Sequence, residues 1–110
     1  MTERLVVLVT APDEAEAEAL GRGAVEGRWA ACASLVAGSR SIFRWEGELR
    51  CDTECLMILK TTREKLEGLI AYLVAHHTYE VPEVIALPVV GGHAEYLSWI
   101  AEETATEATP

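Results

Sequence analysis

The chain is poor in basic side chains, with 9 Lys and Arg against 18 Asp and Glu in 110 residues and a formal net charge of -9. Binding of nucleic-acid phosphates needs clustered Lys and Arg, so this balance argues against a nucleic-acid partner. An acidic surface attracts cations and basic partners instead. Half of the residues are hydrophobic and a quarter are charged. These proportions are typical of a globular protein, and the length suits one domain.

Long apolar runs are missing as well. No stretch reaches the roughly 18 residues that a membrane-spanning helix needs. The segment from Met1 to Arg4 shows no basic region followed by an apolar segment and a small-residue cleavage site. We therefore expect a cytoplasmic protein with no membrane partner.

Cysteine is scarce and irregularly spaced. The residues Cys32, Cys51 and Cys55 are odd in number and form no CxxC pair, so neither a disulfide framework nor a structural zinc site is expected. If Cys51 and Cys55 lie on one strand, their backbones are roughly 13 Å apart. That separation is too large for the two thiols to hold one ion together within a regular strand.

Motifs of the common enzyme classes are absent. The chain has no GxGxxG, no P-loop GxxxxGK[ST], no HExxH and no GxSxG motif. A nucleophile pair formed by Cys32 and a histidine is the remaining enzymatic alternative, but these residue types occur in most chains of this size. We therefore expect no enzymatic activity.

Apolar periodicity predicts the element order β-α-β-β-α-β with a C-terminal helix. The run Leu5–Val9 is typical of a strand buried on both faces. Asp13 and Glu16 have capping-box spacing at the start of a helix, and Thr61 and Glu64 repeat this spacing before a second helix. The expected helices cover about 14–28, 62–77 and 93–103, and the expected extended segments cover 5–9, 31–36, 41–45, 49–61 and 84–90.

This order predicts an α+β fold of the ferredoxin-like type, an antiparallel sheet with two helices on one face. Pro88 marks the last strand as an edge or a bulge, because proline cannot donate to a strand ladder. We expect one domain at 1–103 and a flexible tail at 104–110, where the residues are small and polar.

The segment 49–61 is too long for its own domain. About 13 residues at roughly 3.3 Å each span about 43 Å. A compact domain of this length has a diameter near about 34 Å. The hairpin at 41–55 should therefore project, exposing Ile42, Phe43 and Trp45 with unpaired backbone groups. Pairing between copies in a closed ring removes this exposure, so we expect a homo-oligomer.

Short motifs along nearly the whole chain resemble the CutA family of divalent-cation tolerance proteins. The matching segments, in family order, are Val-Thr-Ala-Pro-Asp-Glu at 9–14, Ala-Ala-Cys at 30–32, Phe-Arg-Trp-Glu-Gly at 43–47, Ile-Leu-Lys-Thr-Thr at 58–62, His-His-x-Tyr-x-x-Pro-Glu at 76–83, Ala-Leu-Pro-Val at 86–89 and Tyr-Leu-Ser-Trp at 96–99. The resemblance implies a homotrimer with exchanged hairpin strands, similar in architecture to PII signalling proteins. It also implies tolerance of copper and other divalent cations, with no established enzymatic activity.

Two positions depart from the family pattern. The family often has Cys at the position of Val9, and Pro at the position of Thr78. The first departure removes a thiolate ligand, and the second alters the loop after the second helix.

Candidate metal ligands are His76, His77, Cys32 and Glu83. Imidazole suits Cu(II), Zn and Ni, while a thiolate suits Cu(I). For Cys32 the alternative is a small buried hydrophobe. For the adjacent histidines the alternative is a helix end stabilised by the macrodipole without a metal.

A second candidate site is the cleft between subunits that the resemblance implies. Its expected residues are Trp45, Glu46, Lys60, Tyr79, Glu83 and Trp99. Such a cleft can hold a small anion, a nucleotide or a hydrated cation. It can equally be a packed seam, because Trp and Tyr are enriched in interfaces. The sequence thus predicts a cation-binding trimer, with a PII-like sensor of a small molecule as the alternative.

Overall fold

A computed structural model describes residues 2–105. The elements are β1 (Arg4–Ala11), α1 (Glu14–Glu26), β2 (Cys32–Trp45), β3 (Glu48–Thr62), α2 (Arg63–His76), β4 (Val84–Pro88) and α3 (Ala94–Thr104). The strands form one antiparallel sheet in the order β2-β3-β1-β4. The predicted α+β ferredoxin-like fold with a C-terminal helix is confirmed, and β4 is an edge strand as Pro88 indicated.

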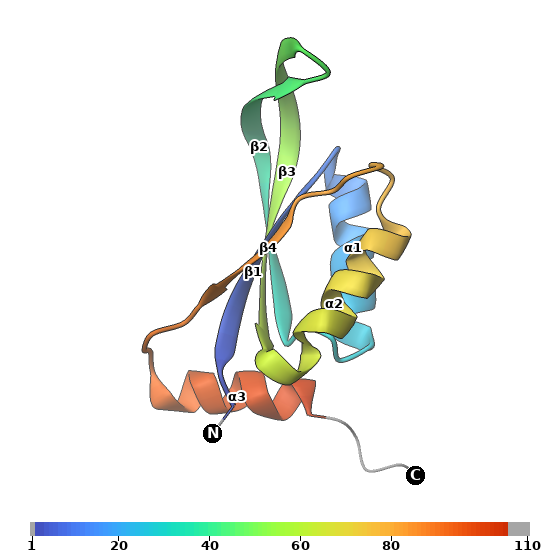
Figure 1. Ribbon diagram of the computed structural model, residues 1–110. Helices are drawn as coiled ribbons and strands as arrows, with labels where there is room; N and C mark the ends of the chain where they lie inside the picture. Colours follow the sequence, from blue (N-terminus) through green and yellow to red (C-terminus); the bar gives the residue numbers. More distant parts are fainter. Residues whose placement is uncertain (1, 106–110) are drawn as a thin grey trace.

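Helices α1 and α2 lie side by side on one face of the sheet, and α3 crosses one end of it (Figure 1). The core lies between the sheet and the first two helices. Its fully buried members include Val7, Val9, Met57, Leu59, Leu69 and Leu73. Burial of one such side chain stabilises the fold by about 1.5–3 kcal/mol.

The starts of α1 and α2 differ in their capping. The carboxylate of Asp13 accepts a hydrogen bond of 2.8 Å from the backbone N–H of Glu16, as its spacing predicted. The predicted capping box of Thr61 and Glu64 is wrong. The N-cap is Thr62, without a side-chain cap, because the Thr61 hydroxyl is buried and donates to the carbonyl oxygen of Trp29 at 2.7 Å.

The expectation that Leu5–Val9 is buried on both faces is also wrong for the single chain. Alternate residues of β1 are buried beneath the helices, whereas those between them are only half-buried. We call the second side of the sheet the open face. Its aliphatic residues are Val6, Leu8, Val36, Leu56, Ile58, Ile85 and Leu87. About half of the surface of Val36, Ile85 and Leu87 is exposed.

The hairpin of β2 and β3 projects beyond the rest of the sheet, as predicted (Figure 1). Pairing with β1 ends at Ala11 opposite Cys55, whereas β2 and β3 continue to Trp45 opposite Glu48. The chain accordingly measures 47 × 31 × 21 Å along its principal axes.

Two glycines with positive φ angles, Gly47 and Gly38, shape this hairpin. Gly47 and its neighbour Glu46 form the turn, with φ angles of 82° and 50°. This is the geometry of a two-residue primed turn, whose twist matches that of the strands. The expected break at residues 37–39 is instead a bulge within a continuous β2, where Gly38 has a φ of 80°.

The chain terminus differs slightly from the sequence prediction. Helix α3 includes Thr104, whose buried hydroxyl donates to the carbonyl oxygen of Ile100 at 2.8 Å. The predicted tail therefore loses its first residue to the helix, and residues 106–110 lie outside the described part of the chain. Among the described residues, no helix has the length and apolar character needed to cross a membrane.

The contact between α2 and the Trp29 ring leads to a test of packing. A Cβ added at Gly68 would collide with that ring. We expect Gly68→Ala to lower the free energy of unfolding by about 1–3 kcal/mol, because the core must shift to admit it. Alanine's intrinsic advantage in a helix, about 1 kcal/mol, acts in the opposite direction.

The measurement is urea unfolding at one protein concentration, with Gly91→Ala as the control. No atom lies within 4 Å of a Cβ built at Gly91. The control should change stability by less than about 0.5 kcal/mol. Equal stability of the two variants would contradict the described contact.

Candidate functional site

His77 follows α2 and is buried. Its Nδ1 lies 3.0 Å from the backbone N–H of Tyr79, which donates to it. The proton is therefore on Nε2, which lies 2.8 Å from the carbonyl oxygen of Thr10 and donates to it. Both ring nitrogens are thus engaged within the chain, and metal binding by His77 requires one of these bonds to break.

His76 has a different environment. It is exposed, and its ring stacks on Tyr72 with 4.4 Å between the ring centroids. Its Nδ1 donates to the carbonyl oxygen of Tyr72 at 2.8 Å, so Nε2 retains its lone pair. Within the described residues, no hydrogen bond involves this Nε2. Of the two adjacent histidines, His76 is the one with a nitrogen ready to bind a metal ion.

Cys32 lies far from the histidines along the sheet. It pairs with Lys60, which in turn pairs with Val6, whereas His77 contacts Thr10. Val6 and Thr10 are four residues apart on β1, which corresponds to about 13 Å along the strand. The Cys32 thiol lies 3.5 Å from the Tyr96 hydroxyl and 3.9 Å from Lys60 Nζ. The contact with the thiol, together with burial, raises the pKa of Tyr96.

Glu83 is exposed and precedes β4. Within residues 2–105, no group of three or more His, Cys, Asp or Glu side chains is arranged to hold a metal ion. One chain therefore does not assemble His76, His77, Cys32 and Glu83 into a ligand set. A set completed between copies stays a prediction.

The predicted cleft residues lie in three places within one chain. Trp45, Tyr79 and Glu83 line a cavity of about 850 Å³ between the hairpin and the loop at 78–83. We call this cavity the hairpin pocket. Other lining residues are Thr10, Ser41, Ile42, Phe43, Arg44, Arg50, Asp52, Glu54, Thr78, Glu80 and Val81.

The second group lies at the opposite end of the sheet. Lys60 is beside Cys32, and Trp99 on α3 packs against Tyr96 with 5.5 Å between the ring centroids. Glu46 occupies the hairpin turn and does not line the pocket. A single chain therefore keeps Lys60, Trp99 and Glu46 apart from the pocket residues.

Sequence reasoning missed Glu54, the buried carboxylate of the hairpin pocket. Only 7% of its surface is exposed, and its Oε2 accepts a hydrogen bond of 2.6 Å from the Tyr79 hydroxyl. Burial and this carboxylate raise the pKa of Tyr79 well above its usual value. The sequence does place Glu54 at the point where β3 changes from polar to apolar, but its partner lies 25 residues away.

A second missed carboxylate fixes the loop after α2. Glu16 on α1 accepts hydrogen bonds from the backbone N–H of Thr78 at 2.9 Å and from its hydroxyl at 2.8 Å. Its Oε2 is also 3.4 Å from His77 Nδ1. Proline at position 78 would supply neither donor. The departure at Thr78 therefore gives this chain a tether between α1 and the loop.

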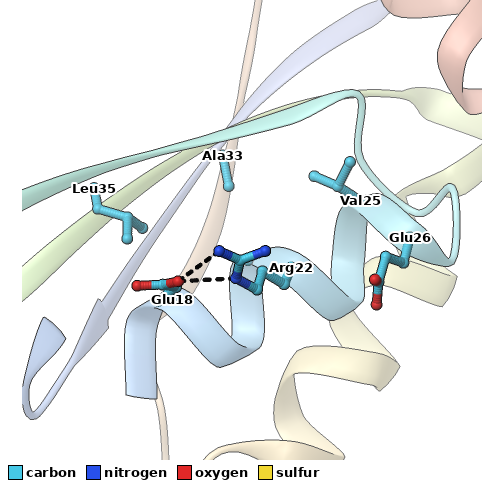
Figure 2. Close-up of a pocket in the computed structure, with 7 residues that line it drawn as sticks. Glu18, Arg22, Val25, Glu26, Ala33 and Leu35 are labelled. Atoms are coloured by element: carbon cyan, nitrogen blue, oxygen red, sulfur yellow. Dashed lines mark hydrogen bonds and ion pairs between the residues drawn. The ribbon is translucent and has the colours of Figure 1, made fainter. Parts of the chain in front are cut away.

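A smaller groove of about 360 Å³ lies between α1 and β2. Figure 2 shows Glu18 and Arg22 paired across its floor, with Leu35 and Ala33 on the strand above them. The ion pair measures 2.8 Å and both side chains are more than half exposed. Exposed pairs of this kind contribute about 0.3–0.5 kcal/mol to stability.

Comparison with known proteins gives one consistent family. The family model described as "CutA1 divalent ion tolerance protein" matches residues 5–103. The divalent-cation tolerance protein CutA of a strain of Escherichia coli is 46% identical over 99 residues, covering 90% of this chain and 88% of that protein.

Solved structures agree with this match. The divalent cation tolerance protein CutA1 from Thermus thermophilus is 43% identical, with a TM-score of 0.90, and the alignment covers 93% of this chain and 99% of that one. A protein from Archaeoglobus fulgidus described as periplasmic divalent cation tolerance protein CutA is 34% identical with a TM-score of 0.90, again covering 93% and 99%.

The bond between Tyr79 and Glu54 predicts a pH-dependent contribution to stability. Tyr79→Phe leaves the buried carboxylate without this donor, and we expect a loss of about 1–3 kcal/mol at pH 7. The raised pKa means that the folded state retains the Tyr79 proton after the unfolded chain has lost it. The contribution is therefore complete below about pH 10 and decreases as the pH rises above that value.

Urea unfolding at pH 7 and at pH 11 checks this expectation. The difference between wild type and Tyr79→Phe should be smaller at pH 11. Tyr72→Phe is the control, because within the described residues no hydrogen bond involves the Tyr72 hydroxyl. A Tyr79→Phe variant as stable as wild type at pH 7 would show that the contact is not formed.

Proposed function

The chain belongs to the CutA1 family of divalent ion tolerance proteins, and we propose from this that it acts in tolerance of metal stress as a non-enzymatic homotrimer. We propose further that the trimer binds copper or another divalent ion. The observation that supports this most strongly is the family match over residues 5–103, which includes every residue of the candidate sites. The open face and the hairpin support assembly, and His76 supports metal binding.

The open face supports assembly. The chain's own helices leave its aliphatic side chains only partly buried, with Val36, Ile85 and Leu87 about half exposed. Complete burial of one such side chain is worth about 1.5–3 kcal/mol, so covering several of them favours association strongly. Apolar patches of this kind on a sheet are typical of surfaces that meet another protein.

The projecting hairpin supports a closed assembly. Ile42 and Leu49 are about 70% exposed, and Trp45 is 42% exposed. The part of the hairpin beyond β1 has no neighbouring strand in its own chain, so its edges retain unpaired backbone groups. A ring of three copies pairs each hairpin with a neighbour and leaves no free end.

The metal site we propose is built around His76. Its free Nε2 is a suitable ligand for Cu(II), which binds nitrogen donors most tightly among the common divalent ions. One imidazole is too few for a stable site, so the remaining donors come from neighbouring copies, with Cys32 and Glu83 as the candidates. The net charge of -9 raises the local concentration of cations.

A PII-like sensor remains the second candidate function. The hairpin pocket, lined by Trp45, Tyr79 and Glu83, is large enough for a small molecule. In a trimer, Lys60, Trp99 and Glu46 of neighbouring copies are available to complete it. Location in the cytoplasm also stays a prediction, since the Archaeoglobus fulgidus relative is described as periplasmic.

Native mass spectrometry before and after addition of copper tests metal binding. We expect the trimer to gain whole-number equivalents of copper, and His76→Ala to lose them. His93→Ala is the matched control, because His93 is also exposed but lies at the N-cap position of α3, away from the end of α2. Copper retained by His76→Ala, or lost equally by both variants, would contradict the assignment.

A pair of hairpin variants tests the assembly. Trp45→Ala removes a large aromatic surface near the tip, whereas Cys51→Ala removes only an exposed thiol. We expect Trp45→Ala to dissociate on dilution at concentrations where Cys51→Ala and wild type remain assembled. Light scattering over a dilution series measures this. Dissociation of the Cys51 variant alone would refute the role of the Trp45 ring.

A further inference from the structure

We propose that Tyr72 is a positioning residue for His76, which it holds in the tautomer and orientation that leave Nε2 free for a divalent ion. This inference deepens the metal binding proposed above and rests on it. It gives a role to a side chain outside the candidate ligands. The contacts that define this role lie within one helix, so they do not depend on how copies assemble.

Two contacts with Tyr72 restrain the His76 ring. Its Nδ1 donates to the carbonyl oxygen of Tyr72 at 2.8 Å, which places the ring proton on Nδ1 and the lone pair on Nε2. The phenol ring lies against the imidazole, with 4.4 Å between the ring centroids and 30° between the planes. A metal-binding histidine usually donates its second ring N–H in this way, because the bond fixes the tautomer and strengthens the donor nitrogen.

The Tyr72 ring is itself fixed by α1. It packs against the core, and its hydroxyl end lies over Gly23, where an added Cβ would collide with it. Glycine is unfavourable in the interior of a helix, and the close approach of Tyr72 accounts for it here. A residue of α1 thus controls the orientation of His76 at the end of α2 through one aromatic ring.

The neighbouring histidine has the opposite tautomer. His77 carries its proton on Nε2, and its Nδ1 accepts from the backbone N–H of Tyr79. The tautomer of each ring is therefore set by its own hydrogen bonds. Among the described residues, the contacts of the His76 ring come from Tyr72, so Tyr72 determines which nitrogen of His76 is available.

Nitrogen NMR of the imidazole rings tests the positioning without metal. In wild-type protein we expect the Nδ1–H form for His76 and the Nε2–H form for His77, with His76→Ala identifying the signals. Tyr72→Leu keeps the backbone carbonyl but removes the ring, so we expect His76 to become a mixture of both tautomers. An Nε2–H form of His76 in wild type, or an unchanged tautomer in Tyr72→Leu, would overturn the proposal.

Copper titration of the native assembly tests the consequence for binding. We expect Tyr72→Leu to bind copper at least about 10-fold more weakly than wild type, and Tyr72→Phe, which keeps the ring, to bind within about twofold of wild type. Gly23→Ala should also weaken binding, because its methyl group displaces the Tyr72 ring.

Gly21→Ala is the matched control on α1. A Cβ at Gly21 lies 3.2 Å from the Cβ of Ala33 on β2, so this change alters packing while Tyr72 stays in place. Equal losses of copper affinity in Gly21→Ala and Gly23→Ala would indicate a general effect of packing and refute the role of Tyr72.

The remaining outcomes separate this inference from the proposed function. Copper bound through His76 with equal affinity in wild type and Tyr72→Leu would refute the role of Tyr72 and leave metal binding intact. Wild-type protein that takes up no copper would refute both. If Tyr72→Leu does not fold, the wild-type tautomer and the Gly23→Ala titration still decide.

Discussion

The sheet of this chain has aliphatic side chains on both faces, while α1 and α2 cover only one of them. This unequal covering of the two faces determines which surfaces of the chain lack a partner. Residues such as Val6 and Ile58 are as apolar as the buried Val7 and Leu59 beside them, but they are only partly buried. The open face lacks a second cover within the chain, and in the assembly proposed above a second copy of the same sheet supplies it. The projecting hairpin extends the requirement, because it too lacks a partner within the chain.

The loop at 77–83 lies between the projecting hairpin and the end of α2, where His76 is. It is held by Thr78 on Glu16, by His77 on Thr10 and by Tyr79 on Glu54. These contacts attach the loop to α1, β1 and β3 in turn, so it forms a fixed wall of the hairpin pocket. They also leave His76 as the histidine with a free nitrogen at the end of α2. The proposed metal site and the proposed small-ligand site therefore both adjoin this tethered segment.

Much of the fold could be predicted from the sequence because its signals are local. The cap at Asp13, the turn at Gly47 and the edge position of Pro88 each follow from the chemistry of one or two neighbouring residues. The predictions were wrong where contacts between residues far apart in the sequence override the local pattern. Thr61 does not cap α2 because its hydroxyl donates a hydrogen bond to the backbone carbonyl oxygen of Trp29. The burial of Leu5–Val9 on both faces is not achieved by one chain.

The site was harder to predict for the same reason. Glu54 is buried against Tyr79, 25 residues away, and no spacing pattern along β3 reveals that partner. Adjacent histidines indicated ligands, but only the folded chain distinguishes the engaged ring of His77 from the available ring of His76.

The most direct test of the account is the mass of the native protein in solution. Light scattering at micromolar concentration should give three times the 12.0 kDa mass of one chain, because the open face and the hairpin are then covered by neighbouring copies. A mass of 12.0 kDa under these conditions would mean that the sheet remains half uncovered in water, and the account would be wrong.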